Sequence, residues 1–229
     1  MSDLAEAATV ALDGDGHPKR GGFLPLVPLP RRMWASSKVE FHAPIMAGAA
    51  ITRRSTITDV SEKTGSSGPL IFVQLDHHTS ANGLLAVYEQ QTLVYREAST
   101  SAPDPKPADI TPDVTDWDWQ RSLIPYETLL FRFSALTFNS HRIHYDRPYA
   151  ETEERYRGLV VHGPLTATLL IDLAARELGP NRLKSFAFRG ESPAFAGETL
   201  HLVGRKQGET ITLAALGGDG RTVMSAQAA

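Results

Sequence analysis

The sequence predicts an α+β fold in which a curved antiparallel sheet wraps a central helix, with two copies of this unit in one chain. Only one stretch, Gly163–Leu178, has a long and strongly apolar helical pattern. Runs rich in Val, Ile, Thr, Leu and Tyr lie on both sides of the segment Ala98–Trp119, which is dense in Pro, Asp, Ser and Thr. One helix with several β-runs indicates a sheet folded on a helix. The 229 residues exceed the usual length of one domain.

The first half is expected to contain an antiparallel meander and no long helix. Three β-runs, Ala50–Val60, Pro69–Thr79 and Leu84–Arg96, are separated by turn-forming residues. Upstream, Asp13–Pro30 contains four Gly and four Pro, which favours an ordered arm. Only Leu4–Leu12 has a helical pattern, and it is barely two turns long. Residues 1–97 are therefore interpreted as a reduced copy of the unit.

After a linker at 98–121, residues 122–229 are interpreted as the complete copy. It is expected to begin with a strand at Leu129–Leu136, an irregular stretch at Thr137–Asp146 and a helical turn at Tyr149–Arg155. The helix Gly163–Leu178 follows, because Pro164 suits a first helical position and Gly179-Pro180 a stop. Four further strands are predicted at Lys184–Arg189, Glu198–Lys206, Glu209–Leu216 and Arg221–Gln227.

A faint internal repeat supports two copies. Pro44 precedes Gly48 by four residues, Pro193 precedes Gly197 in the same way, and a predicted strand follows each pair at an offset of 149 residues (Pro44 to Pro193). Coincidental Pro/Gly turns are the alternative.

Composition favours a small-molecule substrate. Hydrophobic residues make up 41% of the chain, charged residues 21%, and the net charge of -3 offers no basic excess for nucleic acid. The absence of cysteine excludes disulfides, thiolate nucleophiles and iron–sulfur clusters. No apolar run is long enough to cross a membrane, and the start of the chain lacks the pattern of a secretory signal, so a cytoplasmic location is expected.

Three histidines, His141, His144 and His162, lie close together in sequence beside the start of the predicted helix. Imidazole exchanges protons near neutral pH, so this cluster is the first candidate for acid–base catalysis. A zinc or iron site that includes Asp146 is an alternative, although His-x-x-His in an irregular stretch fixes no ligand geometry. Structural histidines bonded to backbone carbonyls are another.

The run Phe133–Asp146, with Tyr149-Ala150 and Tyr156–Leu165, resembles the hydroxyacyl-thioester dehydratase type 2 branch of the MaoC-like, R-specific enoyl-CoA hydratases, and most closely its mesaconyl-CoA or itaconyl-CoA hydratases. In the first half, Arg31–Ala35, Gly68–Val73 and Glu89–Glu97 resemble the N-terminal hotdog domain of that family. The resemblance implies a double hotdog fold with a reduced first hotdog. It also implies a hydratase or dehydratase that acts on an acyl-CoA thioester, without a separate cofactor. A fused pair of hotdogs with a weak first half is expected to form a homodimer, which would bury exposed sheet edges.

The resemblance also assigns candidate catalytic residues. The family motif places an Asp, then Asn two residues later and His five residues after the Asp; Asn139, His141 and His144 stand there in this chain. The carboxylate is therefore missing, and Asn139 can only orient water or the substrate carbonyl. His144 becomes the leading general acid–base, and the backbone N–H of Gly163 is expected to stabilise the enolate oxygen. Asp146 is a possible substitute carboxylate, but an N-cap is its commoner role.

Substrate contacts are expected from residues around these groups. His141 and His162 flank the catalytic positions. Arg142 and Arg189 are candidates to pair with the carboxylate of a dicarboxyl acyl group, because arginine binds carboxylates bidentately. The coenzyme phosphates need cations, for which the candidates are Arg31 and Arg32, with Lys19 and Arg20; ordinary surface charge is the alternative for all four.

Two other functions fit the same resemblance. A hotdog thioesterase would need a carboxylate near the helix, and Asp146, Glu151 and Asp172 are the nearest in sequence. A non-catalytic acyl-CoA binding subunit would explain both the missing Asp and the reduced first half.

Overall fold

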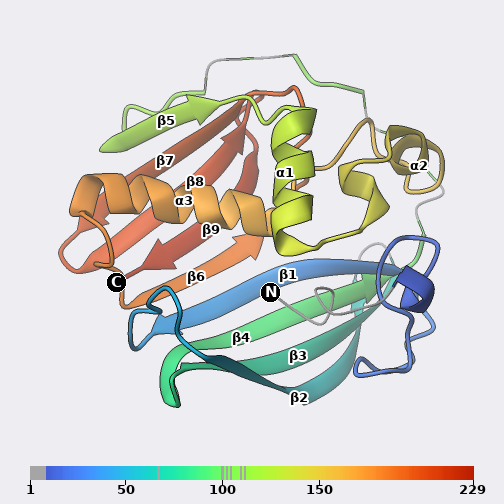
Figure 1. The fold of residues 1–229 in the computed structure, drawn as a ribbon. Coiled ribbons are helices and arrows are strands. Elements are labelled where there is room, and N and C mark those ends of the chain that lie inside the picture. The colour runs from blue at the N-terminus through green and yellow to red at the C-terminus, as the bar shows by residue number, and fades with distance from the viewer. Residues whose placement is uncertain are drawn as a thin grey trace.

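Nine strands form one antiparallel sheet in the computed structural model, which describes residues 9–65, 68–98, 101, 103, 105–108, 110 and 112–229. The strands are β1 (Arg31–Phe41), β2 (Ile51–Gly65), β3 (Gly68–Ala81), β4 (Leu84–Arg96), β5 (Trp119–Leu123), β6 (Ser185–Gly190), β7 (Leu200–Gln207), β8 (Thr210–Gly217) and β9 (Thr222–Ala228). The helices are α1 (Glu127–Thr137), α2 (Arg147–Thr152) and α3 (Gly163–Leu178), with short 3-10 turns at Thr9–Ala11 and Arg142–His144. Figure 1 shows the sheet curving around α3.

The strand order repeats in mirror image, which reveals the two copies. The order is β2-β3-β4-β1-β6-β9-β8-β7-β5. We number the strands of each copy 1 to 4, so that β1, β2, β3 and β4 correspond to β6, β7, β8 and β9. The order in the sheet is then 2-3-4-1 in the first copy and 1-4-3-2 in the second. The copies meet where β1 pairs antiparallel with β6, from Ser36 opposite Arg189 to Glu40 opposite Ser185.

The Pro/Gly repeat marks equivalent points in the two copies. Gly48 and Gly197 both adopt positive φ, +85° and +80°, a conformation that glycine adopts without steric cost. Each lies shortly before the second strand of its copy, β2 or β7. The repeat therefore corresponds to a shared turn and is not a coincidence.

Helix α3 has the bounds predicted from the sequence. Pro lies in its first turn and Gly179 caps its end. Its buried residues pack with strand residues such as Phe186, Leu202 and Leu213 in the main core. Leu170 and Leu173 are 0% and 2% exposed, and each such burial contributes about 1.5–3 kcal/mol of hydrophobic stabilisation.

The strand predicted at Leu129–Leu136 is wrong, because these residues form α1. Alternating Leu129, Phe131 and Phe133 suggested a strand, but Leu130 is the fully buried residue and Leu129 and Phe133 pack beside it against the core. Residues i, i+3 and i+4 share one face of a helix, so packing on the core selects the helix. The helix ends at Phe138, which adopts the left-handed conformation.

The predicted linker ends earlier than expected. Its described residues before Trp119 form no helix or strand, and β5 starts at Trp119 and pairs with β7. The other second-half strands lie within a few residues of their predicted positions. The division into two domains stays a prediction, since the sheet is continuous through β1 and β6.

The first half has no long helix among the described residues. The helical pattern at Leu4–Leu12 lies largely outside them, and only the short turn Thr9–Ala11 is seen. Instead, the arm that precedes β1 packs Val27 and Leu29 against Val73, Leu75 and Tyr95 of β3 and β4. The arm therefore covers the apolar sheet surface, and the first copy is reduced as expected.

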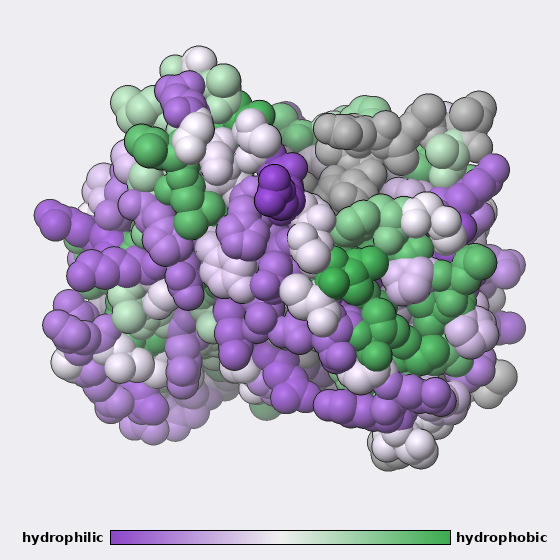
Figure 2. Space-filling model, turned by 90° about the horizontal axis from the view of Figure 1, so that it is seen from below, coloured by the Kyte–Doolittle hydropathy of each residue, from purple (hydrophilic) through white to green (hydrophobic). Residues whose placement is uncertain are grey.

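The outer edge at β2 is protected by charge. This strand is mostly exposed and contains Arg53, Arg54, Asp59, Glu62 and Lys63. Seen from below, the surface is mainly hydrophilic, with a hydrophobic patch on the right and smaller apolar areas elsewhere (Figure 2). Charged side chains on an edge strand oppose pairing with other chains. No helix in the described part of the chain is both long and apolar enough to span a membrane.

Candidate active site

One large cavity, with a volume of about 1270 Å³, is lined by both halves of the chain. The first half contributes the arm, β1, β3 and β4, and the second half contributes the loop Asn139–His144, the start of α3 and the end of β6. Both His144 and Gly163 line it. The two groups predicted to act on one ligand therefore face the same space, which is large enough for an extended ligand.

His144 is held as a neutral imidazole with one nitrogen free to accept a proton. It lies in the 3-10 turn Arg142–His144, and its Nδ1 donates to the carbonyl of Val160 at 2.7 Å, which leaves Nε2 as the acceptor. The neighbouring backbone bond from Val160 to the carbonyl of Ile143 fixes this geometry. Burial lowers the pKa of His144 to about 4, so the ring is uncharged at neutral pH.

His162 is a packing partner of His144. Its ring stacks on that of His144 with 3.6 Å between centroids, and its Nε2 is 2.9 Å from the hydroxyl of Ser134 in α1. It is fully buried and is not among the residues that line the cavity. Burial, with the proximity of His144, lowers its pKa to about 2. The geometry thus favours positioning of His144, and the predicted contact of His162 with substrate stays a prediction.

Asn139 and Gly163 present hydrogen-bond donors to the cavity. The side-chain oxygen of Asn139 accepts the N–H of His141 at 3.0 Å, which leaves the amide NH₂ of Asn139 to donate. Gly163 is the first residue of α3, where backbone N–H groups lack partners within the helix and the helix dipole favours negative charge. A Cβ added at Gly163 would meet no protein atom within 4 Å, so the space beside it is open.

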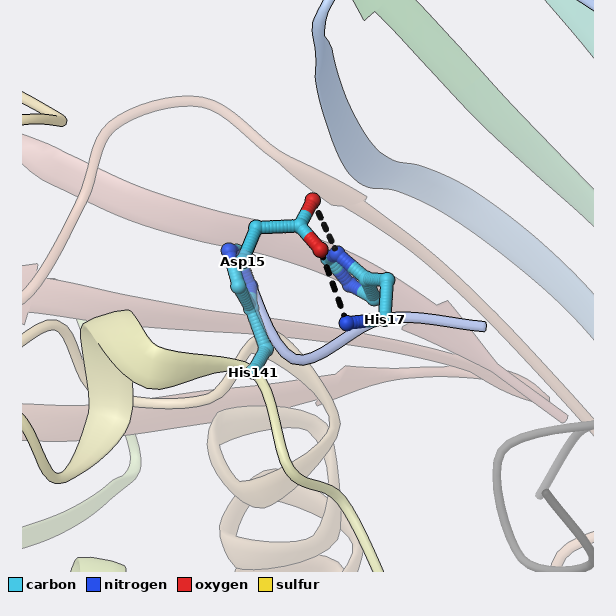
Figure 3. Close-up of side chains that lie close together, drawn as sticks. All are labelled: Asp15, His17 and His141. Carbon is cyan, nitrogen blue, oxygen red and sulfur yellow. Dashed lines mark hydrogen bonds and ion pairs between the residues drawn. The ribbon is translucent and has the colours of Figure 1, made fainter. Parts of the chain in front are cut away.

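Asp15 and His17 were not predicted as site residues from the sequence, and the arm brings them to His141 (Figure 3). The ring of His17 lies 3.9 Å from that of His141, centroid to centroid, and His17 lines the cavity. Asp15 accepts hydrogen bonds from the backbone N–H of His17 at 2.8 Å and from its Nδ1 at 3.1 Å. An Asp-x-His pattern in a Gly- and Pro-rich arm was the only local signal, and it gave no hint of a long-range contact.

His17 completes a row of four imidazoles with His141, His144 and His162. His141 contacts His17 on one side and His144 on the other, the latter edge to face at 5.4 Å, and His144 then stacks on His162. Burial is the first cause that lowers the pKa of His141, and the charges of His17 and His144 add to it. Acceptance of a proton by one ring therefore disfavours protonation of its neighbours.

Asp146 does not face the cavity, and its predicted N-cap role is confirmed. Its carboxylate accepts the N–H of Tyr149 at the start of α2. Arg142 donates to the same carboxylate through two nitrogens, at 3.0 and 2.8 Å, and its guanidinium lies 4.0 Å from the ring centre of Tyr149. It also donates to the carbonyl of Gly14. The geometry therefore does not favour Arg142 as a substrate ligand or Asp146 as the missing carboxylate.

The other predicted cations divide into two groups. Arg31 pairs with Glu154 and the carbonyl of Glu153, and it is not among the cavity-lining residues. Arg32 and Arg189 both line the cavity, and no ion pair within 4 Å is found for either among the described residues, although the charge of Arg32 acts on the nearby carboxylate of Asp15. Lys19, Arg20, Arg96 and Arg155 line the same cavity, so Arg32 and Arg189 are two of several cations that could meet an anionic substrate.

Comparisons with known proteins match these features. The family model for hydroxyacyl-thioester dehydratase type 2 matches residues 4–196. A mesaconyl-C(4)-CoA hydratase from Chloroflexus aurantiacus is 46% identical over 97% of this chain and 79% of its own. A MaoC-like dehydratase from Phytophthora capsici superposes with a TM-score of 0.68 at 15% identity, covering 92% of this chain and 76% of that one. A double-hotdog protein from Mycobacterium tuberculosis gives 0.60 at 14% identity, covering 86% and 74%. The predicted double hotdog fold is thus confirmed.

Proposed function

Because this chain belongs to the hydroxyacyl-thioester dehydratase type 2 family, we propose that it catalyses the reversible addition of water to a short, branched, dicarboxylic α,β-unsaturated acyl-CoA. A hydratase or dehydratase of acyl-CoA thioesters follows from the family and from the 46% identical hydratase. The observation that carries the proposal is the shared cavity, which brings the free Nε2 of His144 to the same space as the start of α3.

The start of α3 serves the thioester carbonyl. Addition of water at the β-carbon moves the electrons of the double bond toward the carbonyl oxygen, which becomes an enolate oxygen. The N–H of Gly163 donates to that oxygen, and the helix dipole adds to the stabilisation. One such donor contributes about 3 kcal/mol to a transition state.

His144 activates the water. Its Nε2 accepts a proton from the water as the oxygen bonds to the β-carbon, and the amide NH₂ of Asn139 orients the water or the carbonyl. A proton then reaches the α-carbon and the electrons return from the enolate oxygen, which completes hydration; dehydration is the reverse. Positioned proton transfer contributes on the order of 100- to 10,000-fold in rate.

The relative's substrate and the cations of the cavity support a dicarboxylic acyl group. The similar protein from Chloroflexus aurantiacus is a mesaconyl-C(4)-CoA hydratase. Arg32 and Arg189 can hold a free carboxylate, and itaconyl-CoA carries a similar one. Arg32 lies near the catalytic row, since its charge contributes to lowering the pKa of His17 and His141. We therefore place the free carboxylate at Arg32, and coenzyme A is the only cofactor-like group, as part of the substrate.

A spectrophotometric assay tests this assignment. Purified protein is mixed with mesaconyl-CoA, itaconyl-CoA and crotonyl-CoA, and loss of the conjugated double bond is followed. His144→Ala should abolish turnover. Unchanged turnover in this variant would indicate another base, and a wild type without turnover on any substrate would favour a binding subunit. Arg32→Met should reduce kcat/KM for the dicarboxylic substrates about 10- to 100-fold, as a lost charged hydrogen bond predicts, and change crotonyl-CoA much less.

Arg189→Met is the matched control for Arg32. The substitution removes the guanidinium of Arg189, which lines the same cavity and forms no ion pair with a carboxylate of the described residues. The opposite result is that Arg189→Met lowers kcat/KM selectively for the dicarboxylic substrates, while Arg32→Met changes kcat/KM equally for all substrates. That result would show that the substrate carboxylate binds at Arg189 in β6.

The three carboxylates that the sequence suggested for a thioesterase have other roles in the structure. Asp146 caps α2, Glu151 pairs with Arg147, and Asp172 pairs with Arg121 and Arg176. None of these three carboxylates lines the cavity. Release of free thiol in the same assay measures thioesterase activity directly.

We also propose a cytoplasmic homodimer. Helix α1 and the residue after it expose Phe131, Leu136 and Phe138 at 65%, 83% and 59% of their surface, which offers an apolar face to a second copy. The mass in solution, measured by light scattering, tests the dimer.

A further inference from the structure

We propose that Asp15 and His17, both in the arm, form a second acid–base pair of the active site and supply the proton transfer that the missing carboxylate at position 139 cannot. The inference rests on the hydratase function proposed above. It concerns the step that function leaves open, namely which group delivers the proton to the α-carbon.

The arm is anchored to the catalytic loop at several points. The N–H of Arg142 donates to the carbonyl of Asp15 at 2.9 Å, and the hydroxyl of Ser140 donates to that of Gly16 at 2.6 Å. A Cβ at Gly16 would overlap the carbonyl oxygen of Ser140, and the backbone of Gly16 has a φ of +86°. Only glycine allows the arm to approach the loop this closely. The placement of His17 is therefore determined by contacts with the loop that carries Asn139 and His144.

The pair has the internal geometry of an acid–base unit. The carboxylate of Asp15 accepts a hydrogen bond from the Nδ1 of His17. The Nε2 of His17 is therefore the nitrogen left for a ligand in the cavity that His17 lines. A carboxylate at Nδ1 fixes the tautomer and stabilises the imidazolium when it forms, as in catalytic triads. Burial alone would raise the pKa of Asp15, but its hydrogen bond and the charge of His17 lower it to about 2. Asp15 thus remains ionised and can balance a charge on the ring.

Two imidazoles can then divide the reaction. The Nε2 of His144 takes a proton from water while oxygen bonds to the β-carbon. That proton passes from His144 through water to the Nε2 of His17, and the carboxylate of Asp15 balances the charge of the imidazolium that forms. The imidazolium of His17 then gives the proton to the α-carbon as the electrons of the enolate oxygen return to the carbonyl, which leaves both rings neutral, as they were at the start. Burial lowers the pKa of His17, which makes its imidazolium a stronger acid.

The same three residues could be considered as a metal site, since ligand atoms of Asp15, His17 and His141 lie within 4.8 Å of one another. Two observations argue for acid–base chemistry instead. The rings of His17 and His141 face each other at 3.9 Å with 36° between planes, whereas imidazole lone pairs lie in the ring plane. The carboxylate is also already hydrogen-bonded to Nδ1 of His17.

Chemical rescue tests the pair. His17→Ala should lower kcat for hydration by on the order of 100- to 10,000-fold, and added imidazole should restore a saturable part of it, because the vacated space opens to the cavity. His17→Gln, which keeps an N–H toward Asp15 but cannot exchange a proton, should show the same loss without rescue and serves if the alanine variant does not fold. Asp15→Asn should reduce kcat in the same direction.

His201→Ala is the matched control, since this histidine bonds to Ser122 and does not line the cavity. Its kcat should equal that of the wild type with and without imidazole. If the wild type is active, two results for His17→Ala overturn the pair. One is an unchanged kcat, and the other is a loss of kcat that imidazole does not restore. A stoichiometric metal ion in the purified protein, with kcat lost on chelation, also overturns it in favour of a metal site. A wild type inactive on every enoyl-CoA overturns the underlying hydratase function itself.

Discussion

Substitution of Gly163 by Ala separates catalysis from folding at the proposed oxyanion position. A Cβ there meets no protein atom within 4 Å, and Gly163 is not among the glycines with positive φ. The variant should therefore fold, and alanine in a helix should make it equally stable or more stable by up to about 1 kcal/mol. The new methyl group projects into the space where the thioester oxygen must approach the N–H.

The loss of activity should approach that of a missing oxyanion donor, on the order of 100- to 1000-fold in kcat, or about 2.7–4 kcal/mol. Steady-state kinetics and thermal unfolding of the same preparation measure the two effects. Gly204→Ala is the contrasting control, because its Cβ would lie 2.8 Å from both Leu213 and Trp119 and should destabilise the fold. Wild-type kcat in Gly163→Ala would refute the assigned contact, and a large loss of stability would refute the open space.

Two further outcomes follow from burial and capping. Burial holds the pKa of His144 at about 4 against 6.5 in the unfolded chain, so the unfolded state binds more protons between these values. The free energy of unfolding should fall as pH drops from 6.5 toward 4, by about 3 kcal/mol from this group, and urea titrations of wild type and His144→Gln should show a smaller fall in the variant. Asp146→Ala removes the N-cap of α2 and the partner of Arg142, and should cost about 1–2 kcal/mol in urea titrations. An unchanged midpoint would show that the cap does not contribute to stability.

The sequence predicted those elements whose signals are local. Pro164 and Gly179 delimit α3 and its residues are apolar on most faces, so its bounds could be predicted to the residue. The strand predicted at Leu129–Leu136 is helix α1. Leu129, Phe131 and Phe133 alternate as in a strand, while Leu129, Leu130 and Phe133 share one face of a helix, and the packing of Leu130 on the core selects the helix. Short apolar runs fit either element until their tertiary partners are known.

The same distinction applies to the site. Asn139 and His144 lie in one loop, and Gly163 starts α3, with only α2 between them. The resemblance of this run to the family motif predicted that the three residues act together, and all three line one cavity. Asp15 and His17 reach the site through a contact between the arm and Ser140, far away in the sequence. Arg142 was expected to bind substrate, but its neighbour in space is Asp146 at i+4, and this ion pair removes it from the cavity.

The reduced first half and the catalytic site are connected through the arm. A helix above β1–β4, equivalent to α3, would occupy the side of the sheet from which Leu75, Gln91 and Leu93 line the cavity. The arm covers only part of that surface, with Val27 and Leu29, and leaves room for a long ligand. The arm that lies in place of this helix also reaches the second half of the chain, because its residues 14–17 contact the catalytic loop. Reduction of one hotdog thus provides both the space for an acyl-CoA and the segment that brings His17 to His141.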